Sequence, residues 1–269
     1  MTTGMNRVRI IVPLMCAALG ACTSESRGPR RLGGPPLRLG TTHTVEQSGA
    51  LAVLDSLDAP VSLRVVVGPS GQILRTAAAG DLDVVLTHAP TLEQRILVAP
   101  GHVTLRCPFV ASRFAIVGPV ADPAHVTEAA SAADAVRRIA AARAVFVSRA
   151  DSSGTHVKEI SLWAAAGINP TGAWYLQTGV DQAATLLLAD ERNGYALADL
   201  PTFSRQQGIE LRRLFDSDTG LANPYTLYVI GATPQSRRGR QFAEWAMREW
   251  RARLPGAAFT PLAGDCAAP

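Results

Sequence analysis

Residues 148–156, SRADSSGTH, combine the residue types that bind oxyanions in proteins. They follow the short apolar run 145–147 and precede a helical pattern, which predicts a strand, a turn and a helix start. The first N–H groups of a helix lack intrahelical acceptors and carry the positive end of its dipole, which attracts anions. Arg149 adds a planar donor for two oxygens of one anion, and Gly154 lets a ligand approach the backbone closely. The segment predicts an anion-binding helix start, with an ordinary capped helix as the alternative.

Two further turns repeat this arrangement. TTHT at 41–44 follows a predicted strand at 37–41, and GPSGQ at 68–72 follows a predicted strand at 61–67. Each turn precedes a helical pattern. In open α/β sheets, ligands bind at the edge formed by the carboxyl ends of the strands. We therefore expect hydroxyl and N–H groups from the three turns to meet around one small anion.

The N-terminus has a pattern typical of a bacterial secretory signal. Arg7 and Arg9 accompany an apolar stretch at 8–19 that is too short to span a membrane. The sequence LGAC that ends at Cys22 resembles a lipobox, which implies removal of residues 1–21 and a lipid on the Cys22 sulfur. An uncleaved anchor or a chance apolar leader is the alternative.

Composition limits what the remaining chain can be. Residues 22–36 are rich in Ser, Gly, Pro and Arg and predict a flexible tether. Removal of residues 1–21 takes away two arginines and no acid, so the formal net charge falls from +4 to +2, which is no signal for nucleic-acid binding. The hydrophobic fraction of 47% suffices for a globular core of one large domain or two lobes. Cys107 and Cys266 could pair in an oxidising compartment or stay free, and the sequence leaves both possibilities open.

Short apolar runs alternate with helical patterns, which predicts an α/β fold of the parallel type. Strands are expected at 37–41, 61–67, 83–87, 105–109, 113–118, 144–148, 173–177, 194–198, 211–214 and 225–230. Helices are expected at 48–57, 71–79, 91–97, 131–142, 154–166, 180–190, 200–207 and 235–251.

Two apolar strands next to turn-forming prolines indicate where lobes meet. They are RFAIVGP at 113–119 and NPYTLYVI at 223–230. If both strands cross between lobes, residues 37–119 plus 223–269 form lobe 1 and residues 120–222 form lobe 2. A single continuous sheet is the alternative.

Eight segments resemble, in order and spacing, the TupA-type tungstate-binding proteins of bacterial ABC importers. The segments are LGTTHTVEQSGALAVL, VVVGPSGQIL, GDLDVVLTHAP, FAIVGP, VSRADSSGTH, WYLQTG, ATLLLADERNGYALAD and NPYTLYVI. The resemblance covers residues 37–250. It implies a type II periplasmic-binding-protein fold of two lobes, each a mostly parallel sheet flanked by helices, with two crossover strands. It also implies a monomeric, non-enzymatic lipoprotein of the cell envelope that delivers its ligand to a membrane permease.

The resemblance also assigns residues to the ligand site. These are Thr41, Thr42, Ser70, Gly71, Arg149, Ser153, Gly154, Thr155 and Gly179. The chain departs from the family pattern at His43 and Thr44 in the first turn. It departs again from Val180 to Ala183, where glycines of the family's turn are replaced and Asp181 is added. These departures bear on the identity of the ligand rather than on the fold.

The protonation of the ligand distinguishes the candidate anions. Tungstate and molybdate carry two charges and no proton at neutral pH, so their site needs donors rather than acceptors. Phosphate carries a proton and needs an acceptor, for which Asp151 and Asp181 are candidates; Asp151, or Ser152, is alternatively the cap of its helix. The segment 149–155 also resembles the Arg-x-Asp-x-Ser-Gly-Thr segment of phosphate-binding members of the superfamily. We expect tungstate first, molybdate second and phosphate third.

His43, His88 and His156 raise the alternative of a metal-dependent hydrolase. No Gly-x-Ser-x-Gly or His-Glu-x-x-His motif occurs, and no Cys or His spacing matches a zinc site. The family pattern also has histidine at the positions of His88 and His156, which implies structural hydrogen bonds there. We expect no cofactor and no metal ion, with tungsten entering only as its oxyanion.

Overall fold

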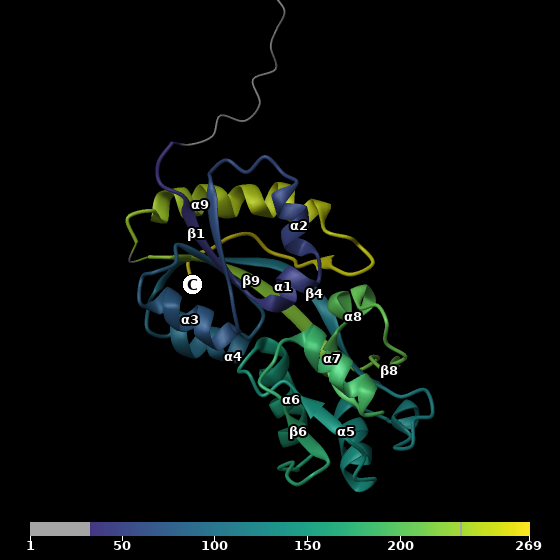
Figure 1. Ribbon diagram of the computed structural model, residues 1–269. Helices are drawn as coiled ribbons and strands as arrows, with labels where there is room; N and C mark the ends of the chain where they lie inside the picture. Colours follow the sequence, from purple (N-terminus) through teal and green to yellow (C-terminus); the bar gives the residue numbers. More distant parts are fainter. Residues whose placement is uncertain (1–32, 232) are drawn as a thin grey trace, which may run out of the picture. The chain divides into compact units, whose positions relative to one another are not determined.

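Strands and helices alternate along most of the chain, as the apolar runs predicted (Figure 1). The computed structural model describes residues 33–231 and 233–269, so the signal at 1–21, the lipidation site Cys22 and most of the tether lie outside the described residues. The strands are β1 (Leu37–Thr41), β2 (Leu63–Val67), β3 (Val84–Thr87), β4 (Val103–Gly118), β5 (Phe146–Ser148), β6 (Tyr175–Gln177), β7 (Ala196–Asp199), β8 (Arg212–Phe215), β9 (Ala222–Ile230) and β10 (Thr260–Pro261). The α-helices are α1 (His43–Gln47), α2 (Ala50–Asp55), α3 (Ser70–Ala78), α4 (Pro90–Glu93), α5 (Ala132–Ala141), α6 (Gly154–Ala165), α7 (Gln182–Glu191), α8 (Leu200–Arg205), α9 (Ser236–Trp245) and α10 (Arg251–Arg253). Short 3-10 segments are η2 (Val126–Glu128) and η3 (Thr219–Leu221), and π-helical turns are η1 (Gln94–Val98) and η4 (Ala246–Trp250).

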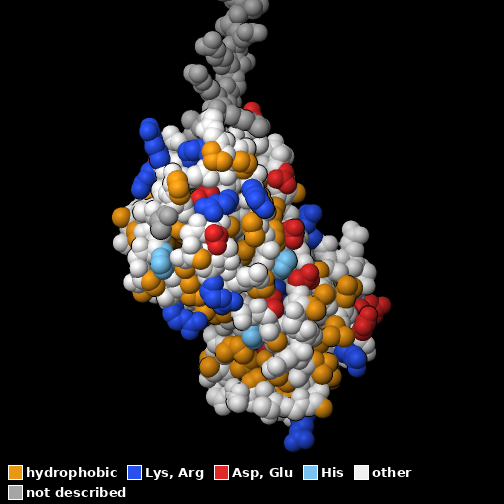
Figure 2. Space-filling model, turned by 60° about the vertical axis from the view of Figure 1, so that its left-hand side comes forward, with side chains coloured by type: hydrophobic (Ala, Val, Ile, Leu, Met, Phe, Trp, Pro, Cys, Tyr) orange, Lys and Arg blue, Asp and Glu red, His pale blue; other side chains and the backbone are white. Residues whose placement is uncertain are grey.

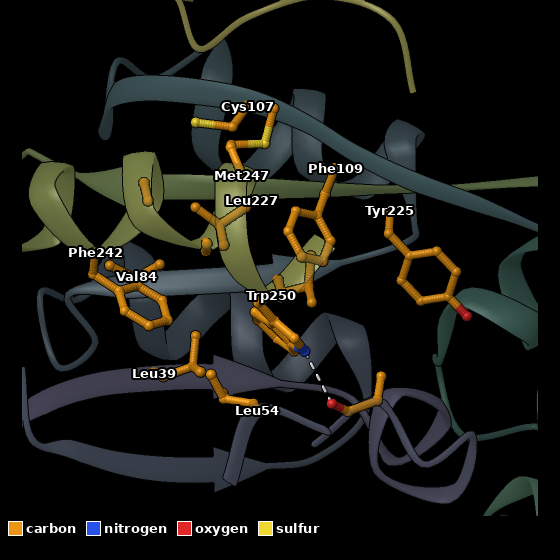
Figure 3. Packing of buried hydrophobic residues seen from close by; sticks show 14 of the residues in the cluster. Leu39, Leu54, Val84, Cys107, Phe109, Tyr225, Leu227, Phe242, Met247 and Trp250 are labelled. Atoms are coloured by element: carbon orange, nitrogen blue, oxygen red, sulfur yellow. Dashed lines mark hydrogen bonds between the residues drawn. The ribbon is translucent and has the colours of Figure 1, made fainter. Parts of the chain in front are cut away.

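A first group of strands has the order β2-β1-β3-β9-β4-β10. β1 pairs in parallel with β2 and β3, whereas β9 pairs antiparallel with β3 and β4. Phe242 from α9 and Trp250 from η4 join the apolar core of this group, together with Leu39 and Leu227 (Figure 3). Trp250 Nε1 donates to the carbonyl oxygen of Ala50 at 3.0 Å, which ties η4 to α2. Burial of each such aromatic side chain contributes on the order of 1.5–3 kcal/mol.

A second group of strands is built on the C-terminal part of β4, from Phe114 to Gly118. This part pairs antiparallel with β7 and β8. β5 pairs in parallel with β6, and a bridge between Phe146 and Tyr195 places β5 beside the chain that enters β7. Helices α5 and α6 pack Val136 and Trp163 into a core that also contains Phe114 and Phe146.

The apolar cores of the two strand groups are separate clusters. Along β4 the change from one core to the other falls between Val110 and Phe114. At the start of β9 it falls between Leu221 and Tyr225. Along β4 this change precedes the predicted boundary at 119, whereas in β9 it falls close to the predicted boundary at 223. The division into two lobes stays a prediction.

The sheets are mixed, so the expected mostly parallel pairing holds only within β1, β2 and β3 and between β5 and β6. The strands expected at 105–109 and 113–118 form the single strand β4. Ser112 interrupts the apolar pattern there, but its hydroxyl is buried and donates to Asp199 Oδ1 at 2.6 Å. Because Ser112 has a buried hydrogen-bond partner, the strand continues through a position at which the sequence predicted its end.

Two local features extend the predicted pattern. Helix α1 precedes the expected helix at 48–57, because the Thr42 hydroxyl accepts a hydrogen bond from Val45 N–H at 3.4 Å and starts a helix directly after β1. Near the C-terminus, Cys107 on β4 forms a disulfide with Cys266. Of the two possibilities that the sequence left open, the structure has the paired cysteines. The pairing fastens the C-terminal tail to β4.

Candidate functional site

The loop between β5 and α6 has an unusual backbone. Ala150 and Ser152 have φ angles of 49° and 60°, in the left-handed region that few residues other than glycine adopt. Such conformations cost on the order of 1–3 kcal/mol each and cluster at functional sites. The cap of α6 is Ser153, whose Oγ accepts from His156 N–H at 3.2 Å. The expected cap at Asp151 or Ser152 is thus wrong by one or two residues, because these residues form the strained turn instead.

Arg149 lies at the centre of this loop and is only 1% exposed. Its Nη2 forms an ion pair of 2.6 Å with Asp151 Oδ2, and its Nη1 donates to Thr44 Oγ1 at 3.5 Å. Its Nε is buried and has no hydrogen-bond partner among the described residues. Asp151 Oδ1 accepts from Ser153 N–H at 3.0 Å, so this carboxylate holds both the guanidinium and the turn.

The first turns of α3 and α6 meet. Gly154 N–H donates to Ser70 Oγ at 3.1 Å, and Gly71 N–H donates to the carbonyl oxygen of Ser152 at 3.2 Å. Gly154 is required here, because a Cβ at this position would lie 2.6 Å from Cε1 and 2.7 Å from the carbonyl oxygen of His88. The turns predicted at 68–72 and 148–156 are therefore brought together.

The turn at 41–44 contributes fewer free donors to the site than expected. The hydroxyl of Thr41 donates to the carbonyl oxygen of Leu86 at 3.0 Å, so its donor is used within the sheet. Thr42 caps α1 as an acceptor, which leaves its hydroxyl hydrogen for another partner. Thr44, a position at which the chain departs from the family pattern, contacts Arg149. His43 instead lies with Nδ1 at 3.6 Å from Glu46 Oε2, and both side chains are partly exposed.

Helix α7 begins beside α1. Ala183 N–H donates to Gln47 Oε1 at 3.3 Å, and Asp181 caps α7 by accepting from Ala184 N–H at 3.0 Å. Burial opposes ionisation of Asp181, but these hydrogen bonds and the charge of Arg149 lower its pKa below the usual range. The added Asp181 is therefore an ionised cap rather than a free acceptor.

Gly179 supports the site through its backbone. Its N–H donates to the carbonyl oxygen of Arg149 at 2.8 Å, and its φ of 71° favours glycine. Thr178 N–H and Oγ1 both donate to the carbonyl oxygen of Ser148. The turn after β6 thus holds the Arg149 loop in place, which is a different role from the expected ligand contact.

His88 takes part in a buried hydrogen bond, as the resemblance implied, but the sequence did not indicate its partners. His88 follows β3, is 2% exposed and interacts through Nδ1 with Asn223 Oδ1 at 2.9 Å. Asn223 Nδ2 donates to Asp199 Oδ1 at 2.8 Å. Burial lowers the pKa of His88 to about 4, so the imidazole is neutral at physiological pH. His156 has the structural role that the resemblance implied, since its Nδ1 accepts from Ser152 N–H at 3.1 Å.

Several buried polar side-chain atoms at this site have no hydrogen-bond partner among the described residues. Within the described part of the chain they include Arg149 Nε, Thr155 Oγ1 and His88 Nε2. Buried polar groups are normally hydrogen-bonded, so unpaired ones next to a helix start indicate a ligand. On the face drawn in Figure 2, basic and acidic side chains are interspersed.

The described residues also bear on binding of metal ions and on crossing of a membrane. Among residues 33–231 and 233–269, no three His, Cys, Asp or Glu side chains come together as a metal site would require. In the same part of the chain, every helix is too short or too polar to cross a bilayer.

Comparison with known proteins identifies the family. A profile of the PBP superfamily domain matches residues 29–249. The tungstate-binding protein TupA of Peptoclostridium acidaminophilum is 32% identical over 223 residues, which cover 78% of this chain and 77% of that protein. The chain belongs to the PBP superfamily and, within it, to the TupA family. This membership confirms the α/β PBP-like fold that the resemblance implied.

Two further relatives agree with this assignment. A protein of Haloferax volcanii assigned by name as an ABC transporter anion-binding protein is 38% identical over 198 residues. The match covers 70% of this chain and 58% of that protein, so the chain spans little more than half of its length. The crystal structure of the tungstate ABC transporter from Geobacter sulfurreducens has 34% identity and a TM-score of 0.67, covering 77% of this chain and 93% of that one. The names describe binding proteins, in agreement with the expected binding role and against an enzymatic one.

Proposed function

We propose that this chain captures one tetrahedral oxyanion at the first turns of α3 and α6 and delivers it to an ABC permease in the membrane. Tungstate is the preferred ligand, molybdate the second and phosphate the third. The observation that carries this proposal is the meeting of Gly154 and Ser70 beside the unpaired donors Arg149 Nε and Thr155 Oγ1. The names of the relatives support an anion as the ligand.

The donor set suits a dianion. Each hydrogen bond to a charged group contributes on the order of 1.5–3 kcal/mol, so several donors are needed to replace the water around two charges. The hydroxyls of Thr42 and Thr155 are neutral donors of this kind, whereas the N–H groups of Gly154 and His156 already donate to Ser70 and Ser153. Arg149 shares its charge with Asp151, which limits the excess positive charge that the protein must bury without ligand.

The two candidate acceptors for a phosphate proton are already engaged. Asp151 accepts from Arg149 and Ser153, and Asp181 accepts from Ala184. Both carboxylates are thus used within the protein, as a partner of Arg149 and as a helix cap. The ranking of tungstate and molybdate before phosphate is supported by the names of the relatives.

The site joins residues of both proposed lobes. Arg149 of lobe 2 (120–222) contacts Thr44 of lobe 1 (37–119 plus 223–269), and the Gly154 contact with Ser70 also joins the two. We propose that the lobes close on the anion and that opening exposes Arg149 for release. Capture then requires one monomer and no second chain.

Isothermal titration calorimetry of the chain from Cys22 onward tests the function. Tungstate, molybdate, sulfate and phosphate are titrated in turn at equal pH and ionic strength. We expect tungstate and molybdate to bind with one ion per chain, and phosphate to bind more weakly. Absence of binding heat with all four ions would reject the proposal.

We also propose that Cys22 carries the lipid anchor that keeps the protein at the outer face of the cytoplasmic membrane. The support is the lipobox-like LGAC sequence and the tether that follows it. Cys22→Ser should move the protein from the membrane fraction to the soluble fraction, whereas Cys266→Ser should leave its fractionation unchanged. Recovery of Cys22→Ser with the membranes would show that the lipid is not the anchor.

A further inference from the structure

His88 lies beside the start of α6, in the middle of the proposed oxyanion site. The ring of Tyr225 stacks on the imidazole with centroids 4.7 Å apart. Gly154 covers the Cε1 edge so closely that an added Cβ would lie 2.6 Å from that atom. The imidazole is thus held in one orientation next to a residue whose N–H belongs to the first turn of α6.

The hydrogen bonds of Asn223 decide which nitrogen of His88 carries the proton. Asn223 Nδ2 donates to Asp199 Oδ1 at 2.8 Å, to Ser112 Oγ at 3.0 Å and to Tyr225 Oη at 3.1 Å. The amide nitrogen must face the carboxylate, so Oδ1 is the atom that faces His88. An amide oxygen only accepts. Nδ1 of His88 therefore donates to it, and Nε2 of the neutral ring has a free lone pair.

His88 Nε2 is buried and has no partner within the described part of the chain. Its unpaired neighbours at the site, Arg149 Nε and Thr155 Oγ1, can both donate to a ligand. A lone pair among donors would repel the bare oxygens of a dianion. A proton placed between Nε2 and a ligand oxygen removes that repulsion.

We propose that His88 is the acceptor of the oxyanion site and that a dianion without a proton is bound together with one proton, held between Nε2 and a ligand oxygen. The proton comes from solvent on binding and returns to solvent on release. Hydrogen phosphate already carries this proton and binds without taking up another. The inference rests on the proposed function, because it concerns the same site.

The charges around His88 favour this uptake once the ligand is bound. Without ligand, burial and the charge of Arg149 keep the imidazole neutral, while Asp151 acts in the opposite direction. The carboxyl group of Asp199 reaches His88 through the Asn223 amide, and Tyr225 stays neutral because burial raises its pKa. Arg149 and Asp151 cancel as a pair, so a bound dianion would bring two uncompensated charges into a buried site. Uptake of one proton lowers the net charge that the ligand brings into the site from two to one.

Proton uptake is measured directly by calorimetry. Tungstate is titrated into the protein at about pH 8 in a series of buffers that differ in ionisation enthalpy, and the slope of binding enthalpy against ionisation enthalpy gives the protons taken up. We expect close to one proton for tungstate and close to none for phosphate. The affinity for tungstate should fall about tenfold for each pH unit above neutrality. Fewer than about half a proton per tungstate would overturn the inference.

Variants assign the proton to this residue. His88→Gln should lose the uptake and flatten the pH dependence of the affinity for tungstate, since an amide does not titrate. His102→Gln, outside the site, is the matched control and should keep the uptake. An uptake of one proton that persists in His88→Gln would place the proton elsewhere.

The wild-type titration needs no variant to fold. Binding without proton uptake rejects only the role of His88. Absence of binding to any oxyanion rejects the proposed function itself.

Discussion

Arg149 and Asp151, two residues apart, form an ion pair of 2.6 Å with side chains only 2% and 6% exposed. Two residues this close in sequence can pair because Ala150 between them has a φ of 49°. The pair neutralises Arg149 and fixes its guanidinium with Nε unpaired. Asp151 thus positions the cation, a role that differs from the helix cap expected from the sequence.

Arg149→Ala should weaken oxyanion binding more than any other side-chain truncation at the site. Loss of a buried charge contact costs roughly 2–5 kcal/mol, which is about 30-fold or more in affinity. Arg149→Lys should recover only part of this, because an ammonium group does not reproduce the planar two-point contact. Calorimetry with tungstate measures both. An Arg149→Ala protein that binds as tightly as wild type would place the site elsewhere.

Asp151→Asn should keep most of the affinity for tungstate. The amide oxygen can still accept from Ser153 N–H, and although Arg149 Nη2 loses its acceptor, the guanidinium keeps its full charge for the ligand. Binding of phosphate should change in the same direction, since the Asp151 oxygens are already engaged by protein donors. The ratio of the two affinities is the measurement. A selective loss of phosphate binding would show instead that Asp151 accepts the ligand proton.

Gly154→Ala should weaken tungstate binding at least tenfold and lower the free energy of unfolding by about 1–3 kcal/mol, as overpacking does in a tight interior. The added methyl group would lie 2.7 Å from the carbonyl oxygen of His88, so α6 must shift away from the site. Gly71→Ala is the matched control at the other helix start, because its Cβ would meet Ser152 at an ordinary 3.4 Å. Equal effects of the two substitutions would contradict this account.

Glu159 makes stability depend on pH. Burial raises its pKa to about 7, although hydrogen bonds from Tyr175 and Trp163 oppose the rise. Since this pKa exceeds the ordinary glutamate value of 4.5, the folded state binds more protons than the unfolded chain between these values, and stability is lost as pH rises through that window. Glu159→Gln should remove this loss, which amounts to about 3 kcal/mol between the two limits.

Urea unfolding of the wild type and Glu159→Gln across this pH range checks the prediction. The exposed Glu244 provides a control, since Glu244→Gln should leave the pH dependence as in the wild type. A wild-type curve parallel to that of Glu159→Gln would show that Glu159 titrates at an ordinary pKa.

The sequence predicted the parts of the site that depend on local pattern. Two helix starts that follow strands contain Ser70, Gly71, Ser153 and Gly154. The strand and the helix start can each be predicted from a short stretch of residues. That the two starts touch follows from the arrangement of β1, β2 and β5, which apolar periodicity does not specify. The rule that ligands bind at the carboxyl ends of the strands of an open α/β sheet, and the resemblance to a family, brought them together before the structure did.

The His88 network could not be predicted in the same way. His88, Asp199 and Asn223 are far apart in sequence, and each follows or lies in an apolar run that looks like ordinary core. Their contacts depend on the pairing of β9 with β3 and of β4 with β7. The polar residues Ser112 and Asn223 at the edges of predicted strands were the available signal, since buried polar groups in strands need partners.

X-ray diffraction at the tungsten absorption edge, from crystals grown with tungstate, tests the central claim most directly. The account predicts one anomalous peak per chain. The oxygens bound to this tungsten atom should lie within hydrogen-bonding distance of Arg149 Nε, the first turn of α6 and the turn at Ser70. A peak away from these groups, or none in crystals of a protein that diffracts well, would contradict the account.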